Sequence, residues 1–157
     1  MDNRFLFPLS MLEEMDHGII REIQITDEYA ERIQGMGFFP GEKVEVLKEA
    51  PLGDPVIYRL GGTTVTLRRE ITSQIMVEIQ QPFSLQFGQS GQRIIIASLV
   101  GGKGFQRKMV SIGVQEGKKF TVLPRNVSHP IVLRTETNQS VLIPYGFASR
   151  IKVTLDF

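Results

Sequence analysis

The chain repeats itself, and this internal duplication limits the possible folds more than any other feature of the sequence. A shift of about 75 residues aligns glycines and apolar positions of the two halves. It places Gly18 on Gly91, Met36-Gly37 on Ile112-Gly113, and Gly41 on Gly117. The 157 residues are therefore predicted to form two domains in tandem, residues 1–80 and 81–157.

Each copy is predicted to begin with a strand, residues 19–25 and 93–99, and to continue into a short helix. In the first copy Asp27 is the predicted N-cap of that helix. Tyr29, Ile33 and Met36 share one helix face, which we assign to the core. The second copy repeats the same spacing with Phe105, Met109 and Ile112.

Glycine and proline mark the ends of the predicted elements. Gly37 and Gly113 follow the two helices, where a left-handed cap favours glycine, and Pro40-Gly41 makes the turn into the next strand. Residues 43–48 alternate charged and apolar side chains, as half-buried antiparallel strands do. Further strands are predicted at residues 56–60, 63–68 and 76–79, with one helical turn at residues 70–74. The pattern predicts a mainly β fold with short helices, namely two tandem SH3-like small barrels.

Cysteine is absent from the chain, which excludes disulfides, thiolate metal sites and cysteine nucleophiles. The only two histidines, His17 and His129, lie in different copies, so a histidine-rich metal cage is hard to build. Residues 13–17 gather three carboxylates and an imidazole, which we interpret as a solvated turn. We predict no cofactor and no tight iron site, with Asp16, His17 and His129 as the residues to test against that prediction.

No apolar run approaches the roughly 20 residues that a bilayer span needs, and the first residues lack the apolar stretch of a secretory signal. We expect a cytoplasmic protein without membrane insertion. No nucleophile elbow or phosphate-loop spacing is present, so the sequence does not predict an enzyme.

Charge is distributed unevenly between the copies. Residues 1–80 hold 8 Lys/Arg and 14 Asp/Glu, a net charge of −6, whereas residues 81–157 hold 10 and 3, a net charge of +7. Two interpretations remain open: drift of solvated surface after duplication, or halves that attract each other or face differently charged partners. Nucleic acid is a disfavoured partner, because few aromatic residues accompany the basic ones at Lys103, Arg107, Lys108, Lys118, Lys119 and Arg125.

The first copy resembles the ferrous iron transport protein A (FeoA) family. The resemblance lies in Met36-Gly37-Phe38-Phe39-Pro40-Gly41, in Pro51-Leu52-Gly53-Asp54-Pro55, and in Leu67-Arg68-Arg69. The second copy matches more loosely, because Arg125-Asn126-Val127-Ser128-His129-Pro130 replaces the second motif and Ile143-Pro144-Tyr145 replaces the third.

The resemblance implies an SH3-like barrel that acts in ferrous iron uptake by binding the cytoplasmic GTPase side of a FeoB-type membrane permease. A non-enzymatic binding module of this kind is our leading hypothesis. The alternative is a metal- or nucleic-acid-linked regulator, because the domain also resembles the C-terminal barrel of iron-dependent repressors. The oligomeric state stays open.

Two loops of the first copy are the candidate partner-binding surface. Phe38 and Phe39 are adjacent on a connection, so at most one of them is expected to face the core. We hypothesise that the exposed phenylalanine and Pro51-Leu52 form one continuous apolar rim. The alternative is that both phenylalanines complete the core. The candidate partner-binding residues are Met36, Phe38, Phe39, Pro51, Leu52, Asp54, Arg68 and Arg69.

Overall fold

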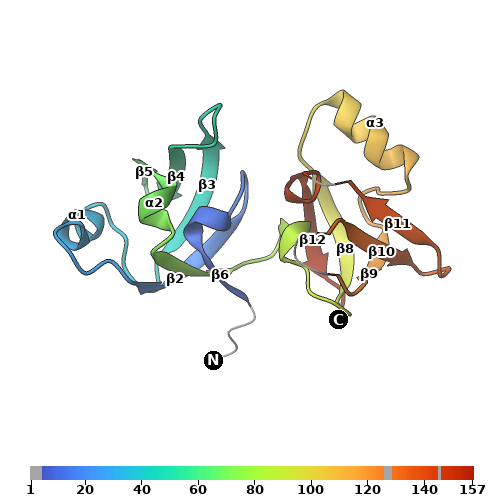
Figure 1. The fold of residues 1–157 in the computed structure, drawn as a ribbon, viewed down its shortest axis with the longest axis horizontal. Coiled ribbons are helices and arrows are strands. Elements are labelled where there is room, and N and C mark those ends of the chain that lie inside the picture. The colour runs from blue at the N-terminus through green and yellow to red at the C-terminus, as the bar shows by residue number, and fades with distance from the viewer. Residues whose placement is uncertain (1–4, 126–128, 145) are drawn as a thin grey trace. The chain divides into compact units, whose positions relative to one another are not determined.

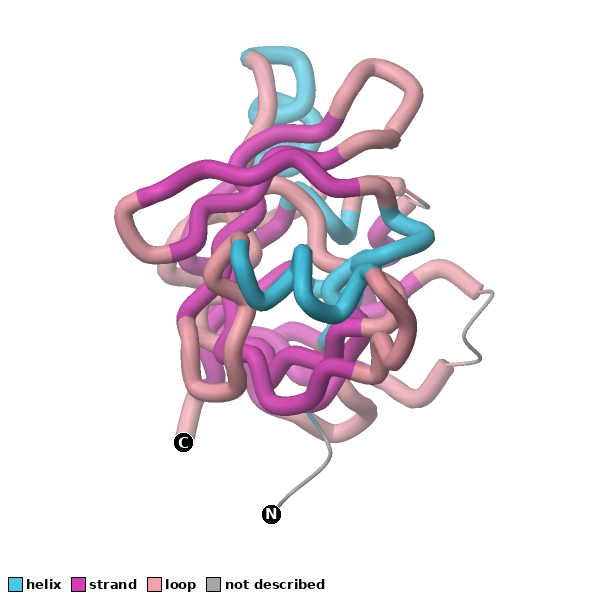
Figure 2. Tube along the Cα trace, turned by 90° about the vertical axis from the view of Figure 1, so that its left-hand side faces the viewer, coloured by secondary structure: helices cyan, strands magenta, loops and turns pink. Residues whose placement is uncertain are grey.

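The computed structural model describes residues 5–125, 129–144 and 146–157. The chain divides into two compact units, and the boundary between them falls between Gln80 and Gln81 in the sequence. In Figure 1 the first unit is coloured blue to green and the second is coloured yellow-green to red. Among the described residues strands predominate over helices, and the helices are short (Figure 2). In the described residues, no helix is long and apolar enough to cross a membrane.

The described part of the first unit contains one antiparallel sheet of six strands in the order β1-β6-β2-β3-β4-β5. Its strands are β1 (Leu6–Pro8), β2 (His17–Ile23), β3 (Lys43–Glu49), β4 (Val56–Leu60), β5 (Thr63–Leu67) and β6 (Ile75–Ile79). Between them lie the helices α1 (Tyr29–Gly35) and α2 (Arg69–Thr72) and the 3-10 turn η2 (Leu9–Met11).

The second unit has the same strand order, β7-β12-β8-β9-β10-β11. Its strands are β7 (Phe83–Ser84), β8 (Arg93–Leu99), β9 (Lys119–Val122), β10 (Ile131–Thr135), β11 (Ser140–Ile143) and β12 (Ile151–Leu155). Its helical elements are α3 (Lys103–Ser111) and the 3-10 turns η3 (Leu85–Phe87) and η4 (Ala148–Arg150). The prediction of two mainly β, SH3-like small barrels with one topology is therefore confirmed.

Alternation along the strands builds each core. In β3 the side chains of Val44 and Val46 are buried while Glu45 between them is partly exposed, and in β4 Val56 and Tyr58 are buried. Successive side chains of a strand point to opposite faces, so one face of the sheet fills the barrel and the other meets solvent. The outer face of β2, β3 and β4 is thus free to carry polar side chains.

The helix α1 has Glu28 at its N-cap position, one residue after the predicted cap Asp27. The Asp27 carboxylate accepts a hydrogen bond from the Tyr29 N–H (2.9 Å), and Gly37 closes the helix end with a left-handed φ of 102°. The assignment of Tyr29 to the core is wrong, because it is 41% exposed and its ring lies 5.7 Å from the Arg32 guanidinium. Ile33 is the buried residue of this helix.

The predicted alignment of Gly18 with Gly91 is also wrong. Met15 is the residue equivalent to Gly91: its N–H donates to the Val46 carbonyl as the Gly91 N–H donates to the Val122 carbonyl. Both residues have a left-handed φ, 70° at Met15 and 84° at Gly91. A side-chain pattern could not reveal this pair, because methionine rarely adopts that conformation.

Two short strands escaped the sequence analysis. β1 pairs with β6, and β7 pairs with the equivalent strand β12, so each adds an edge that the predicted five strands lacked. The first long strand also begins earlier than predicted, at His17 rather than at residue 19.

Candidate functional site

The loop between β3 and β4, residues 50–55, places an apolar side chain in solvent. The Ala50 N–H donates to the Pro55 carbonyl (3.0 Å), and the Gly53 N–H donates to the Ala50 carbonyl (2.7 Å). Gly53 has a φ of 88°, which this turn requires and glycine tolerates. Leu52 lies within this turn and is 96% exposed. The loop is therefore a hydrogen-bonded turn that presents a leucine.

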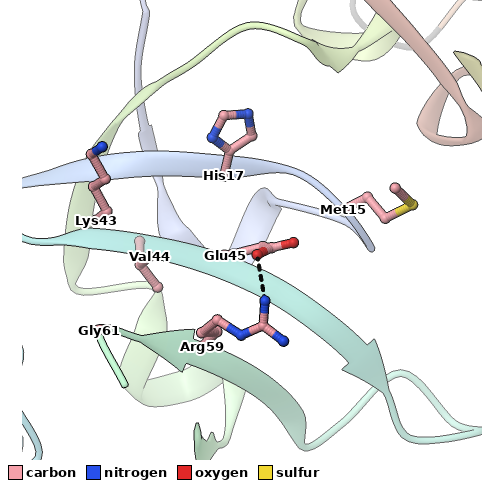
Figure 3. A pocket seen from close by; sticks show the side chains of 7 residues that line it. All are labelled: Met15, His17, Lys43, Val44, Glu45, Arg59 and Gly61. Carbon is pink, nitrogen blue, oxygen red and sulfur yellow. Dashed lines mark ion pairs between the residues drawn. The ribbon is translucent and has the colours of Figure 1, made fainter. Parts of the chain in front are cut away.

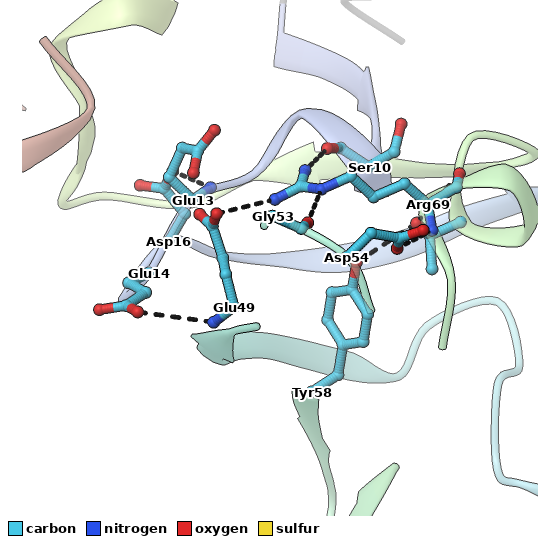
Figure 4. Close-up of polar contacts among 10 residues, drawn as sticks. Ser10, Glu13, Glu14, Asp16, Glu49, Gly53, Asp54, Tyr58 and Arg69 are labelled. Carbon is cyan, nitrogen blue, oxygen red and sulfur yellow. Dashed lines mark hydrogen bonds and ion pairs between the residues drawn. The ribbon is translucent and has the colours of Figure 1, made fainter. Parts of the chain in front are cut away.

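Arg69, the first residue of α2, ties this loop to the rest of the barrel (Figure 4). Its Nε donates to the Gly53 carbonyl (2.6 Å), and its Nη1 donates to the Ser10 carbonyl in η2. Its Nη2 lies 3.3 Å from Glu49 Oε2, at the end of β3. The planar guanidinium thus joins three segments at once, and the role that the geometry gives Arg69 is to position the loop.

Asp54 also links the loop to α2, here through a side chain of the loop and the backbone of the helix. Its Oδ1 accepts a hydrogen bond from the Arg69 backbone N–H (2.8 Å), one of the donors that the start of a helix leaves without an intrahelical partner. Arg68, the residue before α2, is exposed. Asp54 and Arg69 therefore brace the loop, whereas Arg68 extends from the same corner into solvent.

Four carboxyl groups gather beside this brace (Figure 4). Asp16 is buried and accepts a hydrogen bond from the Glu13 N–H (2.9 Å), and Glu14 accepts one from the Glu49 N–H (3.5 Å). Burial, a side-chain hydrogen bond with Glu49 and the charge of Glu49 raise the pKa of Glu13 to about 8. The interpretation of residues 13–17 as a solvated turn is wrong at Asp16, whose carboxylate is an internal hydrogen-bond acceptor.

The structure separates the two phenylalanines. Phe38 is fully buried in the core, and Phe39 is 46% exposed, so only one of the pair faces inward, as expected. Because it has no exposed surface, Phe38 is a core residue and offers nothing to a partner. Met36, at the end of α1, is partly exposed.

The two predicted loops do not form one rim. Phe39 precedes β3 and Leu52 follows it, and the seven-residue strand between them spans about 20 Å at roughly 3.3 Å per residue. Figure 1 shows α1 and the β3–β4 loop at different ends of the first unit. The hypothesis of a continuous apolar rim is therefore wrong, and Phe39 and Leu52 are separate exposed positions.

The candidate metal ligands do not form one group within either described unit. Asp16 is buried, whereas the adjacent His17 is partly exposed on β2. His129 is exposed in the second unit. In residues 5–125, 129–144 and 146–157, no three His, Cys, Asp or Glu side chains form a group that could hold a metal ion.

The second copy permits a partial comparison. Residues 126–128, in the segment that replaces the leucine loop, lie outside the described residues, and so does Tyr145, which replaces Arg69 in the alignment. The β3–β4 loop of the first unit is consequently the one that the structure describes in full.

Two groups that contact the Arg69 side chain were not predicted from the sequence. Glu49 occurs in an alternating strand, where a charged residue is typical of the solvent face, and Ser10 contributes only its backbone carbonyl. Neither position has a local signature, because both are recruited by a residue distant in sequence.

As a class, the two units are SH3-like small barrels, of which the first displays a braced surface loop. The chain belongs to the FeoA domain family, whose profile matches residues 7–79 and again residues 83–155. This confirms the resemblance and links the chain to a family of ferrous iron transport.

Two similar proteins illustrate the family. Iron(II) transport protein A from Clostridium thermocellum has a solution structure with 31% sequence identity and a TM-score of 0.62, over 94% of this chain and 86% of that one. An Fe(2+) transport protein A/Fe(2+) transporter FeoB fusion protein from Porphyromonas gingivalis is 39% identical over 71 residues. That alignment covers 45% of this chain and only 8% of the fusion protein.

Proposed function

We propose that this chain is a non-enzymatic, cytoplasmic docking module of ferrous iron transport that binds the cytoplasmic GTPase part of a FeoB-type permease. The observation that supports this most is the similarity to a protein in which an Fe(2+) transport protein A and a FeoB transporter form one chain. Two modules that one protein joins covalently act in the same process, and a separate copy of the first module needs a surface to reach the second.

The β3–β4 loop of the first barrel is the proposed contact. Leu52 is 96% exposed, and the contacts of Arg69 and Asp54 fix the loop before any partner arrives. A loop that is ordered in advance loses less conformational entropy on binding than a flexible one does. Phe39, exposed at the other end of β3, is a second and independent contact.

Binding of the full chain to the soluble GTPase domain of the permease from the same organism tests this proposal. Burying a leucine contributes about 1.5–3 kcal/mol, so Leu52→Asp should weaken binding by about 10- to 100-fold. Biolayer interferometry measures the change in Kd, and circular dichroism checks that the fold is intact.

Leu142→Asp is the matched control, because Leu142 is also an exposed leucine, 59% accessible, but lies in the second barrel. The control variant should bind as the unchanged chain does. Phe39→Asp tests the second contact separately. Equal binding by Leu52→Asp and the unchanged chain would show that the loop is not part of the interface. No binding by the unchanged chain would contradict the docking function.

A further inference from the structure

The outer face of the first barrel carries a pocket of about 450 Å³ (Figure 3). His17 of β2 is opposite Glu45 of β3, and Glu45 is opposite Arg59 of β4, so these side chains form one row across three strands. Lys43 lies two residues before Glu45 on the same face, and the exposed side chain of Met15 closes one end. These residues line a pocket on solvent-facing strands, apart from the braced loop.

The lining of the pocket has a net positive charge, although the domain is acidic. Lys43 and Arg59 are cationic, and His17 offers a ring N–H when neutral and a positive charge when protonated. Glu45 is the carboxylate among the lining residues, and its Oε2 lies 3.6 Å from Arg59 Nη1. Residues 1–80 have 14 acidic and 8 basic side chains, so the charge of the pocket is opposite in sign to that of the domain as a whole.

The second barrel has an equivalent pocket of about 50 Å³. Arg93 of β8 is opposite Thr121 of β9, and Thr121 is opposite Arg134 of β10, which reproduces the row of the first barrel in register. Lys119 takes the place of Lys43, two residues before the centre of the row. Both copies therefore place three nitrogen-bearing side chains at the same positions of the same sheet face.

In the second barrel two carboxylates of the chain itself, Glu136 and Asp156, line this pocket, and Asp156 pairs with the basic row. Asp156 Oδ2 is 3.1 Å from Arg93 Nη2 and 3.8 Å from Lys119 Nζ, and the Asp156 side chain is only 13% exposed. The Asp156 N–H donates to the Arg93 carbonyl (2.8 Å), which fixes this residue beside the strand. The second copy thus shows which chemical group the basic row accepts.

In the first barrel an amide residue stands at the position of that carboxylate. The Gln80 N–H donates to the His17 carbonyl (3.0 Å), the backbone bond that Asp156 makes in the other copy. The Gln80 side chain, however, donates to Glu78 Oε2 (3.1 Å). The first pocket consequently has the larger volume and a neutral residue where its counterpart holds Asp156. Its row also contains Glu45, which pairs with Arg59 at the position of the neutral Thr121, so His17 and Lys43 are the members of the row at the positions that Asp156 faces in the second barrel.

We propose that the first pocket binds an Asp or Glu side chain from an acidic segment of a partner protein, with the carboxylate between His17 and Lys43. The partner is a peptide segment rather than a small free anion, because a single carboxylate would leave the exposed Met15 uncovered and most of the volume unfilled. This site uses other residues than the β3–β4 loop and does not rest on the proposed function.

Nuclear magnetic resonance titration of the full chain, labelled with ¹⁵N, tests the proposal. The probe is a blocked peptide, acetyl-Gly-Leu-Asp-Asp-Leu-Gly-amide, and the comparison peptide has Asn at both Asp positions. The acidic peptide should shift the backbone amides of His17, Lys43 and Gly61 saturably, and the Asn peptide should bind at least about tenfold more weakly. Equal affinity for the two peptides, equal affinity for inorganic phosphate, or no saturable shift would overturn the proposal.

Variants locate the site. Lys43→Gln should lower the affinity for the acidic peptide about tenfold. Lys48→Gln removes the same charge from an exposed position of the same strand and should change this affinity little. Gln80→Asp should lower the affinity for the acidic peptide, because the new carboxylate of the chain would compete with the peptide for the basic row. Asp156→Asn should create a second peptide-binding site in the second barrel. Equal losses in the two lysine variants would show that general charge attraction causes the binding, and would overturn the proposal.

Discussion

Replacing Arg69 with alanine removes the brace of the β3–β4 loop in one step. The guanidinium donates to the carbonyls of Gly53 and Ser10 and pairs with Glu49, with the Arg69 and Glu49 side chains 27% and 24% exposed. Hydrogen bonds to charged groups each contribute about 1.5–3 kcal/mol when buried, and partial solvation of the freed acceptors lowers the sum. We expect Arg69→Ala to lower the free energy of unfolding of the first barrel by about 3 kcal/mol.

A loss of this size is easy to measure. In a domain of about 80 residues, 1 kcal/mol corresponds to roughly 4–8 °C, so the melting temperature of the first barrel should fall by about 12–24 °C. Hydrogen exchange followed by nuclear magnetic resonance assigns the change to a unit: the Gly53 amide should lose protection, and the amides of β8 in the second barrel should not. Thermal unfolding followed by circular dichroism gives the temperature.

Arg68→Ala is the control for the brace. Arg68 is adjacent in sequence, carries the same charge and is exposed, so its removal should change the free energy of unfolding by no more than about 0.5 kcal/mol. If Arg69→Ala cost no more than this control, the contacts of the guanidinium would contribute nothing to the stability of the loop, and the argument for a fixed docking surface would fail.

Two further predictions concern the first barrel. Because its pKa is raised to about 8, Glu13 stabilises the fold fully below its unfolded value of 4.5, and this contribution is lost as the pH rises through about 8. Urea unfolding of Glu13→Gln should therefore show a weaker decline of stability between pH 5 and 8 than the unchanged chain, and an equal decline would assign the pH dependence to other groups. Gly18→Ala would place a Cβ 2.7 Å from the Glu78 carbonyl oxygen and should cost about 1–3 kcal/mol in the same assay. Gly62→Ala, which meets nothing within 4 Å, should cost much less, and equal costs would refute the close approach.

The sequence predicted those parts of the fold that local patterns encode. The alternation in residues 43–48 and the glycines at Gly37 and Gly113 identified a strand and two helix ends that the structure confirms. β7 has only two residues, too few for a periodicity to show, and β1 ends in proline, which a strand pattern counts against. The short length of β7 and the proline in β1 therefore explain why these two strands could not be predicted from the sequence.

The candidate site was predictable to a smaller extent. The sequence predicted that Leu52 and one of the pair Phe38 and Phe39 would be exposed, and the exposed residues are Leu52 and Phe39. It did not show that Arg69 faces inward, because the acceptors come from η2, from the loop and from the end of β3. The separation of Phe39 from Leu52 follows from topology alone, since a whole strand lies between them.

The two copies reach one structural result with different residues. In the first barrel the Ser10 carbonyl of η2 accepts a hydrogen bond from Arg69, which precedes β6. In the second barrel the equivalent carbonyl, that of Gln86 in η3, accepts one from Arg125 (3.1 Å), which follows β9 at the position of Glu49. A guanidinium therefore contacts the same turn in both copies, but it comes from α2 in the first copy and from the segment after β9 in the second. Because each copy supplies its arginine from a different segment of the chain, an alignment of side chains does not reveal this shared contact.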